Sequence, residues 1–417
     1  MRTIKQEYYF PVIISIHFIL WWIDLTLYKG SYEYTSKHIA GEVFSSWVVT
    51  VLAANFLMAT RAKWVERIFG GLDKMYMIHR RSAVIAVVLL ILHFVVVPRN
   101  PEFSIGKPMG FYSLVLILIG VILAAAPVFK RKLKYNKWLV THKLMGLFYV
   151  LGIAHSLNVP TLTSELPIVR SYVYGMALVG IAAWFYKAFL YGLFNRTCEY
   201  TVKSIKRFEN DVLEVSLEPA NQKLAFNPGQ FAFVSFSGTM TREAHPFTIS
   251  SHSSDNSLRF TIKALGDYTA DLQNSLKEGT TARVRGSYGH FDFKKAKHNK
   301  QIWLAGGIGI TPFLSFLREV SSDYEVTFIW SVRSADHANY KDEIEQVISD
   351  KPNVNFVLWD SGSKGFFTID RMYRSTTIEY HSIFICGPEV MRESHIKQLL
   401  EKGVPIRDIH YEEFSFR

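Results

Sequence analysis

The stretch IHRRSAVIAVVLLILHFVVV, residues 78–97, is apolar along most of its length, yet it carries a histidine near each end, His79 and His93. About 20 residues is the length that an α-helix needs to cross the roughly 30 Å hydrocarbon core of a bilayer. A second stretch, WLVTHKLMGLFYVLGIAHSL at residues 138–157, repeats the pattern with His142 and His155. Ionisable side chains inside membrane spans are costly and usually functional, so these four histidines dominate the interpretation of this half of the chain.

Six apolar stretches are predicted as transmembrane helices, at residues 9–27, 43–60, 78–97, 109–129, 138–157 and 172–193. The connections 61–81 and 130–137 are rich in Lys and Arg, and the connections on the other side are much poorer in them. The positive-inside rule then places both chain ends in the cytosol, in a multi-pass protein of the plasma (inner) membrane. The net charge of +11 is therefore interpreted as a topology signal and as attraction to the lipid bilayer, and no nucleic-acid partner is expected.

Histidines from two facing helices could hold two b-type haems, because haem iron accepts neutral imidazole as an axial ligand. The spacing is 14 residues from His79 to His93 and 13 residues from His142 to His155. At about 1.5 Å per residue each spacing spans roughly 20 Å, which would place one haem near each membrane face. Because both helices run outward, we expect an inner haem on His79 and His142 and an outer haem on His93 and His155.

The spacing of 13 residues between His142 and His155 does not fit an ideal helix. On an ideal helix, 13 steps end about 140° away from the start, whereas 14 steps return to within about 40° of it. The fifth span therefore needs a local irregularity, which Gly146 and Gly152 could permit. His17 in the first span and His38 in an outer connection have no matching partners, and we expect both to be structural.

From Cys198 onward the sequence changes to short β-rich runs separated by Gly, Pro and Asn turns, which predicts a small antiparallel barrel. After Lys300 strands alternate with helices, which predicts an α/β domain with a parallel sheet. The expected fold is multidomain, with a six-helix transmembrane bundle at 1–195, a β-barrel at 196–298 and an α/β domain at 299–417. The two cysteines, Cys198 and Cys386, imply no disulfide framework and fit a reducing compartment.

The turn after the first strand of the α/β domain reads GGIGITP, residues 306–312. Glycines let a backbone approach a pyrophosphate, and the start of the next helix favours its negative charge, although the turn departs from the G-x-G-x-x-G pattern. The residues expected to hold the nucleotide here are Gly306, Gly307, Gly309, Thr311 and Pro312. The second strand ends near Arg333 with no Asp or Glu for a ribose hydroxyl, which favours NADPH over NADH.

The barrel carries HPFTISS, residues 245–251, which resembles the flavin-binding signature of the ferredoxin–NADP reductase superfamily in the form used by NADPH oxidases and ferric reductases. The soluble reductases usually have Arg, Tyr and Ser where His245, Phe247 and Thr248 stand here, and this departure matches the membrane branch. The resemblance implies FAD as a cofactor, with Phe247 along the flavin and Thr248 and Ser251 hydrogen-bonding to it. His245 and Pro246 would belong to the same site.

Three further segments extend the resemblance. IKALGDYT, residues 262–269, resembles the family's FAD-phosphate segment, with Lys263 and Thr269 as the main contacts beside Tyr268. GSYGHF, residues 286–291, resembles the family's Gly-x-Tyr-Gly barrel turn. The tripeptide Cys386, Gly387 and Pro388 matches the one at the nicotinamide end of the NADPH site. The tail YEEFSFR, residues 411–417, resembles tails whose aromatic ring stacks on the flavin until nicotinamide displaces it; Phe414 is favoured for this role and Phe416 is the alternate.

Together with the histidines, the resemblance covers nearly the whole chain and is nearest to the compact bacterial NADPH oxidase type. It implies electron transfer from cytosolic NADPH through FAD and two b-type haems to dioxygen on the outer side, which would give superoxide. A transmembrane ferric-chelate reductase, an electron donor to a periplasmic partner, and a carrier or sensor regulated by its flavin domain remain alternatives. No calcium-binding module or docking insertion is recognised, so no obligatory protein activator is expected.

Overall fold

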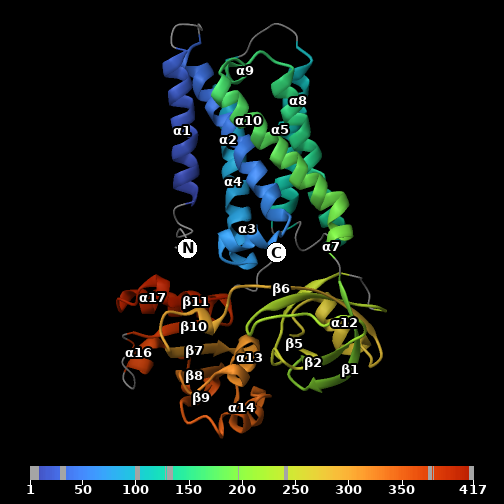
Figure 1. Cartoon of the computed structure of the whole chain (residues 1–417), viewed down its shortest axis with the longest axis vertical. Coiled ribbons are helices and arrows are strands. Elements are labelled where there is room, and N and C mark those ends of the chain that lie inside the picture. The colour runs from blue at the N-terminus through green and yellow to red at the C-terminus, as the bar shows by residue number, and fades with distance from the viewer. Residues whose placement is uncertain are drawn as a thin grey trace. The chain divides into compact units, whose positions relative to one another are not determined.

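The chain divides into two compact units, residues 1–195 and residues 196–417. The computed structural model describes residues 9–28, 34–98, 104–126, 128, 135–195, 197–238, 243–373, 378 and 380–412. The first unit is helical, and the second contains two sheets with helices, as Figure 1 shows for each.

The first unit is a bundle of helices. Its elements are α1 (Tyr9–Leu27), α2 (Ser36–Ala59), α3 (Lys63–Phe69), α4 (Leu72–Val96), α5 (Gly106–Ala125), α7 (Tyr135–Lys143), α8 (Met145–Leu157), α9 (Leu162–Glu165), α10 (Pro167–Phe185), the π-helical turn η2 (Tyr186–Leu190) and α11 (Tyr191–Phe194). Helix α2 packs against α4 and α10, and α5 packs against α8. Apolar side chains from these five helices form a common core around Tyr149, which is 3 % exposed.

Each of the six predicted spans is mainly helical in its described part. Within the described residues, four helices are long and apolar enough to cross a membrane: Ser36–Ala59, Leu72–Val96, Gly106–Ala125 and Pro167–Phe194. In the first predicted span the described apolar part, Ser15–Leu27, is shorter. The fifth is divided at Leu144 into α7 and α8. Membrane crossing by these last two stays a prediction.

Local sequence explains where several helices begin and end. Helix α4 ends at Val96, shortly before Pro98, because a proline disfavours helical conformation in the residue before it. Helix α10 begins at Pro167, where the missing N–H has no helical partner to lose. Helix α2 follows Thr35, whose hydroxyl accepts the amide of His38 at 3.4 Å.

Two buried carboxylates in the apolar helices lie against helix N-termini. Glu42 of α2 accepts the amides of Leu162 and Thr163, both at 2.6 Å. Asp24 of α1 accepts the amide of Val169 at 2.6 Å. Amides in the first turn of a helix lack an intrahelical partner and carry partial positive charge, so each carboxylate stabilises the helix that it caps. These contacts attach α9 and α10 to α1 and α2.

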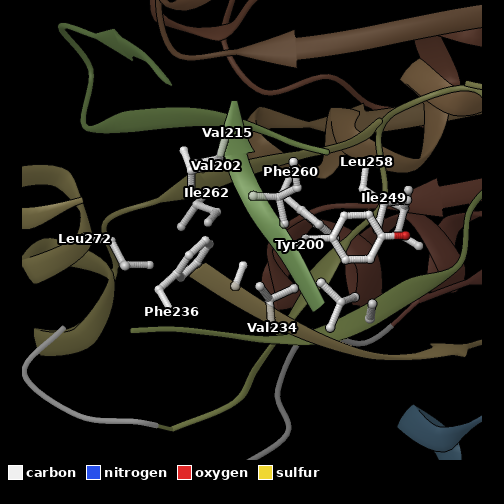
Figure 2. Close-up of a cluster of buried hydrophobic side chains, with 14 of the residues drawn as sticks. Tyr200, Val202, Val215, Val234, Phe236, Ile249, Leu258, Phe260, Ile262 and Leu272 are labelled. Atoms are coloured by element: carbon white, nitrogen blue, oxygen red, sulfur yellow. The ribbon is translucent and has the colours of Figure 1, made fainter. Parts of the chain in front are cut away.

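The second unit begins with a six-stranded antiparallel sheet. In spatial order its strands are β4 (His245–Thr248), β3 (Phe231–Phe236), β6 (Thr281–Tyr288), β1 (Cys198–Phe208), β2 (Val212–Pro219) and β5 (Leu258–Lys263). A bridge between Ile249 and Phe260 joins the two edges. Figure 2 shows the enclosed apolar cluster, which includes Tyr200, Phe236 and Leu272, the last from α12 (Asp267–Ser275). The predicted antiparallel barrel is confirmed.

A five-stranded parallel sheet forms the rest of the second unit. In spatial order its strands are β11 (Ile409–Tyr411), β10 (Ser382–Cys386), β7 (Lys300–Gly306), β8 (Glu325–Val332) and β9 (Val354–Asp360), and its helices are α13 (Thr311–Glu319), α14 (Lys341–Ile348), α15 (Ser361–Lys364), α16 (Ile369–Tyr373) and α17 (Glu389–Glu401). Trp303 packs into the cluster that includes α13 and α14, while its neighbours Ile302 and Leu304 pack into the cluster of α16 and α17. Burial on both faces is typical of a parallel sheet, and the predicted α/β domain is confirmed.

Candidate functional site

The four span histidines meet as two pairs. The ring centres of His79 and His142 lie 6.0 Å apart, with the ring planes at 71°. The ring centres of His93 and His155 lie 6.4 Å apart, with the planes at 70°. Helix α4 supplies one member of each pair, α7 supplies His142 and α8 supplies His155. The structure thus brings together the same partners that the sequence predicts.

Backbone carbonyl groups orient the rings of the second pair. Nδ1 of His93 lies 2.8 Å from the carbonyl oxygen of Gly41, and Nδ1 of His155 lies 2.9 Å from that of Gly106. Because a carbonyl oxygen only accepts hydrogen bonds, Nδ1 of each ring carries the proton. The lone pair on Nε2 is then available to a metal, which is the usual arrangement of a ligating histidine.

The distance in each pair fits two axial imidazoles on one iron. A nitrogen–metal bond of about 2 Å on each side, plus roughly 1 Å from nitrogen to ring centre, puts the ring centres about 6 Å apart. Among the described residues no group of three or more His, Cys, Asp or Glu side chains could hold a metal ion. A haem held by two histidines needs only the pair, so the donor set of each pair fits that cofactor.

Glycines allow close packing around the second pair. A Cβ atom added at Gly110 of α5 would lie 2.7 Å from Nδ1 of His155. One added at Gly41 of α2 would lie 2.3 Å from Cγ2 of Val97. Real Cβ contacts essentially never fall below 3.0 Å, so any larger residue would displace its neighbours. These two glycines therefore let α5 and α2 approach the segments that carry the second pair.

The predicted irregularity between His142 and His155 is present. Helix α7 ends at Lys143 and α8 begins at Met145. The amide of Leu144 bonds to the carbonyl of Thr141 at 3.2 Å, three residues back instead of four. The break lies just before Gly146, but Gly152 lies inside α8, so the suggestion that Gly152 takes part was wrong.

The two unpaired histidines have local roles. His17 is 1 % exposed, and its Nε2 lies 3.0 Å from Oγ of Ser46. Its ring contacts Trp47 edge-on, with the ring centres 5.3 Å apart. Nδ1 of His38 lies 2.9 Å from the hydroxyl of Thr35, which caps α2. These contacts agree with the structural roles expected for both.

The first four residues of the predicted flavin segment form β4, His245–Thr248, an outer strand in the order of the six-stranded sheet. The ring of His245 stacks on Tyr268 at 3.9 Å with an angle of 15° between the planes, and Phe247 lies 6.5 Å from His245. Burial lowers the pKa of His245, and the charge of Asp267 offsets part of this effect. At neutral pH the ring is thus mainly neutral. Strand β4 and the start of α12, which come from the two predicted FAD segments, are therefore adjacent.

Ser251, predicted to hydrogen-bond the flavin, is 2 % exposed. Its hydroxyl oxygen accepts the backbone amide of Arg259 on β5 at 3.1 Å. The hydroxyl hydrogen is still available to donate. Thr248, at the end of β4, is 5 % exposed. Contact of either side chain with FAD stays a prediction, and the structure adds a role for Ser251 in fixing β5 to the flavin segment.

The predicted FAD-phosphate residues surround the start of α12. Lys263 is exposed at the end of β5. Thr269 reaches back to the turn before the helix, where its hydroxyl oxygen accepts the amides of Leu265 at 2.9 Å and Gly266 at 3.0 Å. Thr269 therefore shapes the turn, and Lys263 supplies the positive charge that a phosphate attracts. Their contact with FAD stays a prediction.

The glycine-rich turn lies where the order of strands reverses. From β7 the chain continues to β8 and β9 on one side, and then crosses to β10 and β11 on the other. Ligands of parallel sheets bind outside the carboxyl ends of the strands at such a point. A Cβ added at Gly309 would lie 2.2 Å from the carbonyl oxygen of Cys386, and one added at Gly387 would lie 3.1 Å from Cα of Gly306. The two segments predicted to hold NADPH are thus in contact.

Other residues of that site lie at the same edge. Gly307 has a φ of +52° with open space around it, and Thr311 and Pro312 begin α13. Arg333 follows β8 and is exposed. Asp360 ends the next strand, but its carboxylate accepts the amides of Gly362 and Ser363 at 2.9 and 3.2 Å. The side chain of Asp360 is thus engaged in capping α15, and Arg333 stands exposed at the carboxyl edge of the sheet.

Cys386 ends β10 and is fully buried. Burial, and then the charge of Glu412, raises the pKa of its thiol well above the ordinary value, so the thiol is protonated at neutral pH. Glu412, which is 3 % exposed, was missed in the sequence. It follows β11, where Tyr411 pairs with Ile385, and this register carries the carboxylate toward Cys386. Phe414 and Phe416 lie outside the described residues.

The chain contains a bundle of apolar helices, an antiparallel barrel, and a parallel α/β domain with a glycine-rich turn at its switch point. This combination is that of a membrane-bound oxidoreductase with flavin and pyridine-nucleotide modules. Three family profiles match in that order: a ferric reductase like transmembrane component at residues 44–153, an FAD-binding domain at 197–309 and an oxidoreductase NAD-binding domain at 303–397. The chain belongs to the ferric reductase/NADPH oxidase transmembrane superfamily.

Curated relatives match about half of the chain. The electron transfer subunit of a probable dihydroorotate dehydrogenase B from Thermococcus kodakarensis is 29 % identical over 216 residues, which are 51 % of this chain and 85 % of that protein. Ferric reduction oxidase 4 from Arabidopsis thaliana is 28 % identical over 215 residues, 50 % of this chain but only 28 % of its own length. The reductase component of propane 2-monooxygenase from Rhodococcus jostii is 25 % identical over 51 % of this chain and 62 % of its own.

Among solved structures, a flavohemoglobin from Malassezia yamatoensis has a TM-score of 0.54 over 91 % of this chain and 99 % of its own. Its sequence identity is 17 %, so the likeness concerns the fold alone. The three profile matches show an oxidoreductase of the ferric-reductase-like class that transfers electrons by way of FAD and NAD(P) modules attached to a membrane domain.

Proposed function

We propose that the chain moves electrons from cytosolic NADPH to dioxygen on the opposite side of the plasma membrane, with one FAD and two b-type haems as its cofactors. The observation that carries this proposal is the pair of facing imidazoles at 6.0 Å and the second pair at 6.4 Å on the same two spans. Histidines that only filled a core would not be expected to form two pairs, each at the distance of two ligands of one iron.

Each part of the chain has a defined task in this proposal. When bound, FAD accepts a hydride and each haem passes single electrons. The glycine turn and Arg333 bind NADPH, β4 and α12 bind FAD, His79 with His142 holds the inner haem, and His93 with His155 holds the outer one. The overall reaction would convert one NADPH and two dioxygen molecules into NADP⁺, two superoxide ions and one proton. Because His93 and His155 would both be ligands of the outer haem, the acceptor would be reduced beside that site.

A ferric chelate is the second candidate acceptor. The matched membrane family is named for ferric reductases, and a ferric reduction oxidase is among the relatives. The same NADPH, FAD and haem sites would serve it, so only the final acceptor differs. Donation to a periplasmic partner would likewise leave every site in the chain unchanged.

The deciding experiment is an anaerobic reduced-minus-oxidised spectrum of the purified, FAD-supplemented protein. NADPH under nitrogen should reduce a b-type haem signal that corresponds to two haems per chain, and air should reoxidise it. Superoxide dismutase-sensitive dye reduction, compared with ferric-chelate reduction, then identifies the acceptor. A protein that shows flavin absorbance but no haem band would contradict the proposed path.

A further inference from the structure

The break between α7 and α8 frees a backbone carbonyl beside one of the paired histidines. In a continuous helix the carbonyl of Lys143 would accept the amide of Leu147. Here that amide donates to Leu144 instead, at 2.9 Å. The carbonyl of Lys143 accepts the indole N–H of Trp184, which comes from α10, at 2.8 Å. A carbonyl that would have no partner in an apolar bundle is therefore satisfied by one side chain from another helix.

The indole of Trp184 also occupies the space above Gly146. A Cβ atom added at Gly146 would lie 2.1 Å from Cγ and from Cδ1 of the indole. Gly146 is buried in the first turn of α8, so the ring covers the break from the α8 side as well. On α10, the π-helical turn η2 begins at Tyr186, two residues after Trp184. Trp184 and Gly146 thus form a matched pair at the break.

His142 precedes Lys143, and its ring has fewer hydrogen bonds than the two histidines of the second pair. Its Nδ1 is buried and has no hydrogen-bond partner among the described residues. Both histidines of the second pair, by contrast, bond to backbone carbonyls through Nδ1. The ring of His142 stacks on Trp138 of the same helix, 5.1 Å away at 11°. Its orientation therefore depends on how the end of α7 is held.

We propose that Trp184 is a positioning residue for the inner haem site. By holding the carbonyl of Lys143, its indole keeps α7 and α8 from joining into a continuous helix. A continuous helix would turn His142 about 140° away from the direction of His155, and so away from the side on which α4 presents His79. This inference rests on the proposed haem function, and it assigns a reason for the spacing of 13 residues.

Trp184→Phe tests the inference, because it keeps a smaller aromatic ring over Gly146 and removes the N–H donor. The purified full-length protein with its cofactors is compared by redox titration of the haem absorbance and by EPR of the oxidised haems. We expect the midpoint potential and the low-spin EPR signal of one haem to shift while those of the other stay in place. Trp22→Phe is the control, since Trp22 on α1 is 69 % exposed, and it should leave both haems unchanged.

The shifted signal is assigned in a His79→Leu background, which should retain only the outer haem. Trp184→Phe should cause no shift there. Gly146→Ala, which pushes the indole away from the break, should reproduce the shift in the otherwise native protein if Trp184→Phe gives too little protein to study. Unchanged potentials and EPR signals in both variants, or a shift that persists in the His79→Leu background, would overturn the inference. A native protein without haem would instead refute the proposed function, whatever Trp184 does.

Discussion

The helical unit, residues 1–195, and the reductase unit, residues 196–417, form their candidate sites in different ways. In the helical unit, the proposed haem sites consist of side chains of one type, the four paired histidines, which project from apolar helices. In the reductase unit, the nucleotide edge is made by backbone: Gly309 and Gly387 bring two segments into contact. A site made of side chains should lose function when the side chain changes, and a site made of backbone should lose it when volume is added.

The largest effect is expected for His93→Leu. Removing a residue that only hydrogen-bonds to a metal ligand lowers the affinity for the metal about 10- to 100-fold. Removing the ligand itself should therefore reduce electron transfer to an external acceptor by more than about 100-fold. The outer haem should be missing from the absorbance spectrum, while NADPH should still reduce the flavin. His38→Leu, in which a histidine outside the pairs is removed, should keep both haems. Unchanged haem content in His93→Leu would refute the assignment of His93.

The next effect concerns stability of the reductase unit. The guanidinium of Arg259 on β5 makes two hydrogen bonds to Glu343 on α14, at 2.8 and 2.9 Å, and its side chain is only 12 % exposed. Arg259→Met removes both bonds and leaves Glu343 with Arg318 as its remaining partner at 2.9 Å, so it should lower the free energy of unfolding by about 2 kcal/mol. Denaturation followed by flavin fluorescence would measure it. The exposed pair of Lys203 and Glu218 is the control, and Lys203→Met should cost less than about 1 kcal/mol.

The same pair predicts a pH dependence. Burial alone would raise the pKa of Glu343, but hydrogen bonds from Arg259 and Arg318 outweigh it and lower the pKa below its ordinary value of 4.5. A carboxyl group with a lowered folded-state pKa stabilises the fold above its unfolded pKa, and this contribution is lost as the pH falls through the folded value. The stability difference between the native protein and Arg259→Met should therefore shrink in acid below about pH 4. A constant difference down to pH 3 would contradict the ion pair.

Gly309→Ala tests the site made of backbone. The added Cβ would lie 2.2 Å from the carbonyl oxygen of Cys386. Because this contact is with backbone, no flexible side chain can move away to relieve it. We expect a loss of about 2 kcal/mol in unfolding free energy, as for other overpacked sites, together with a raised KM for NADPH. Gly403, unlike Gly309, has a positive φ of +81°, and it has open space around it. Gly403→Ala should therefore cost only about 1 kcal/mol and leave the KM for NADPH unchanged.

Residue type and periodicity predicted much of both units. Histidines stand out in apolar spans, and helices are linear, so near-equal spacings on two spans predicted which rings would meet. The place of the break at Leu144 could not be predicted, because it depends on Trp184, 41 residues away from the carbonyl that it binds. Glu412 was missed because its approach to Cys386 requires the pairing of β10 with β11. The contact of Arg259 with Glu343 spans 84 residues and leaves no local signal.

A smaller effect is expected at the exposed edge of the reductase unit. Arg333→Ser should raise the KM for NADPH about tenfold, equivalent to about 1.4 kcal/mol, because an exposed guanidinium contributes modestly to binding a phosphate. The KM for NADH should stay the same, since NADH has no 2′-phosphate for Arg333 to bind. Arg283→Ser, which changes an arginine on the barrel whose side chain is 61 % exposed, is the control. Equal changes for both nucleotides would remove Arg333 from the 2′-phosphate site.

The smallest effect is expected at the tail, where a side chain and a nucleotide would compete for one surface. If the ring of Phe414 covers the flavin, Phe414→Ala should ease access of nicotinamide and change the rate of flavin reduction several-fold, a difference of about 1 kcal/mol in barrier height. Stopped-flow reduction of the flavin by NADPH would measure this without involving the helical unit. Phe416→Ala, two residues further on, is the matched control. A rate change in Phe416→Ala alone would transfer the role to Phe416, and no change in either would show that the tail does not cover the flavin.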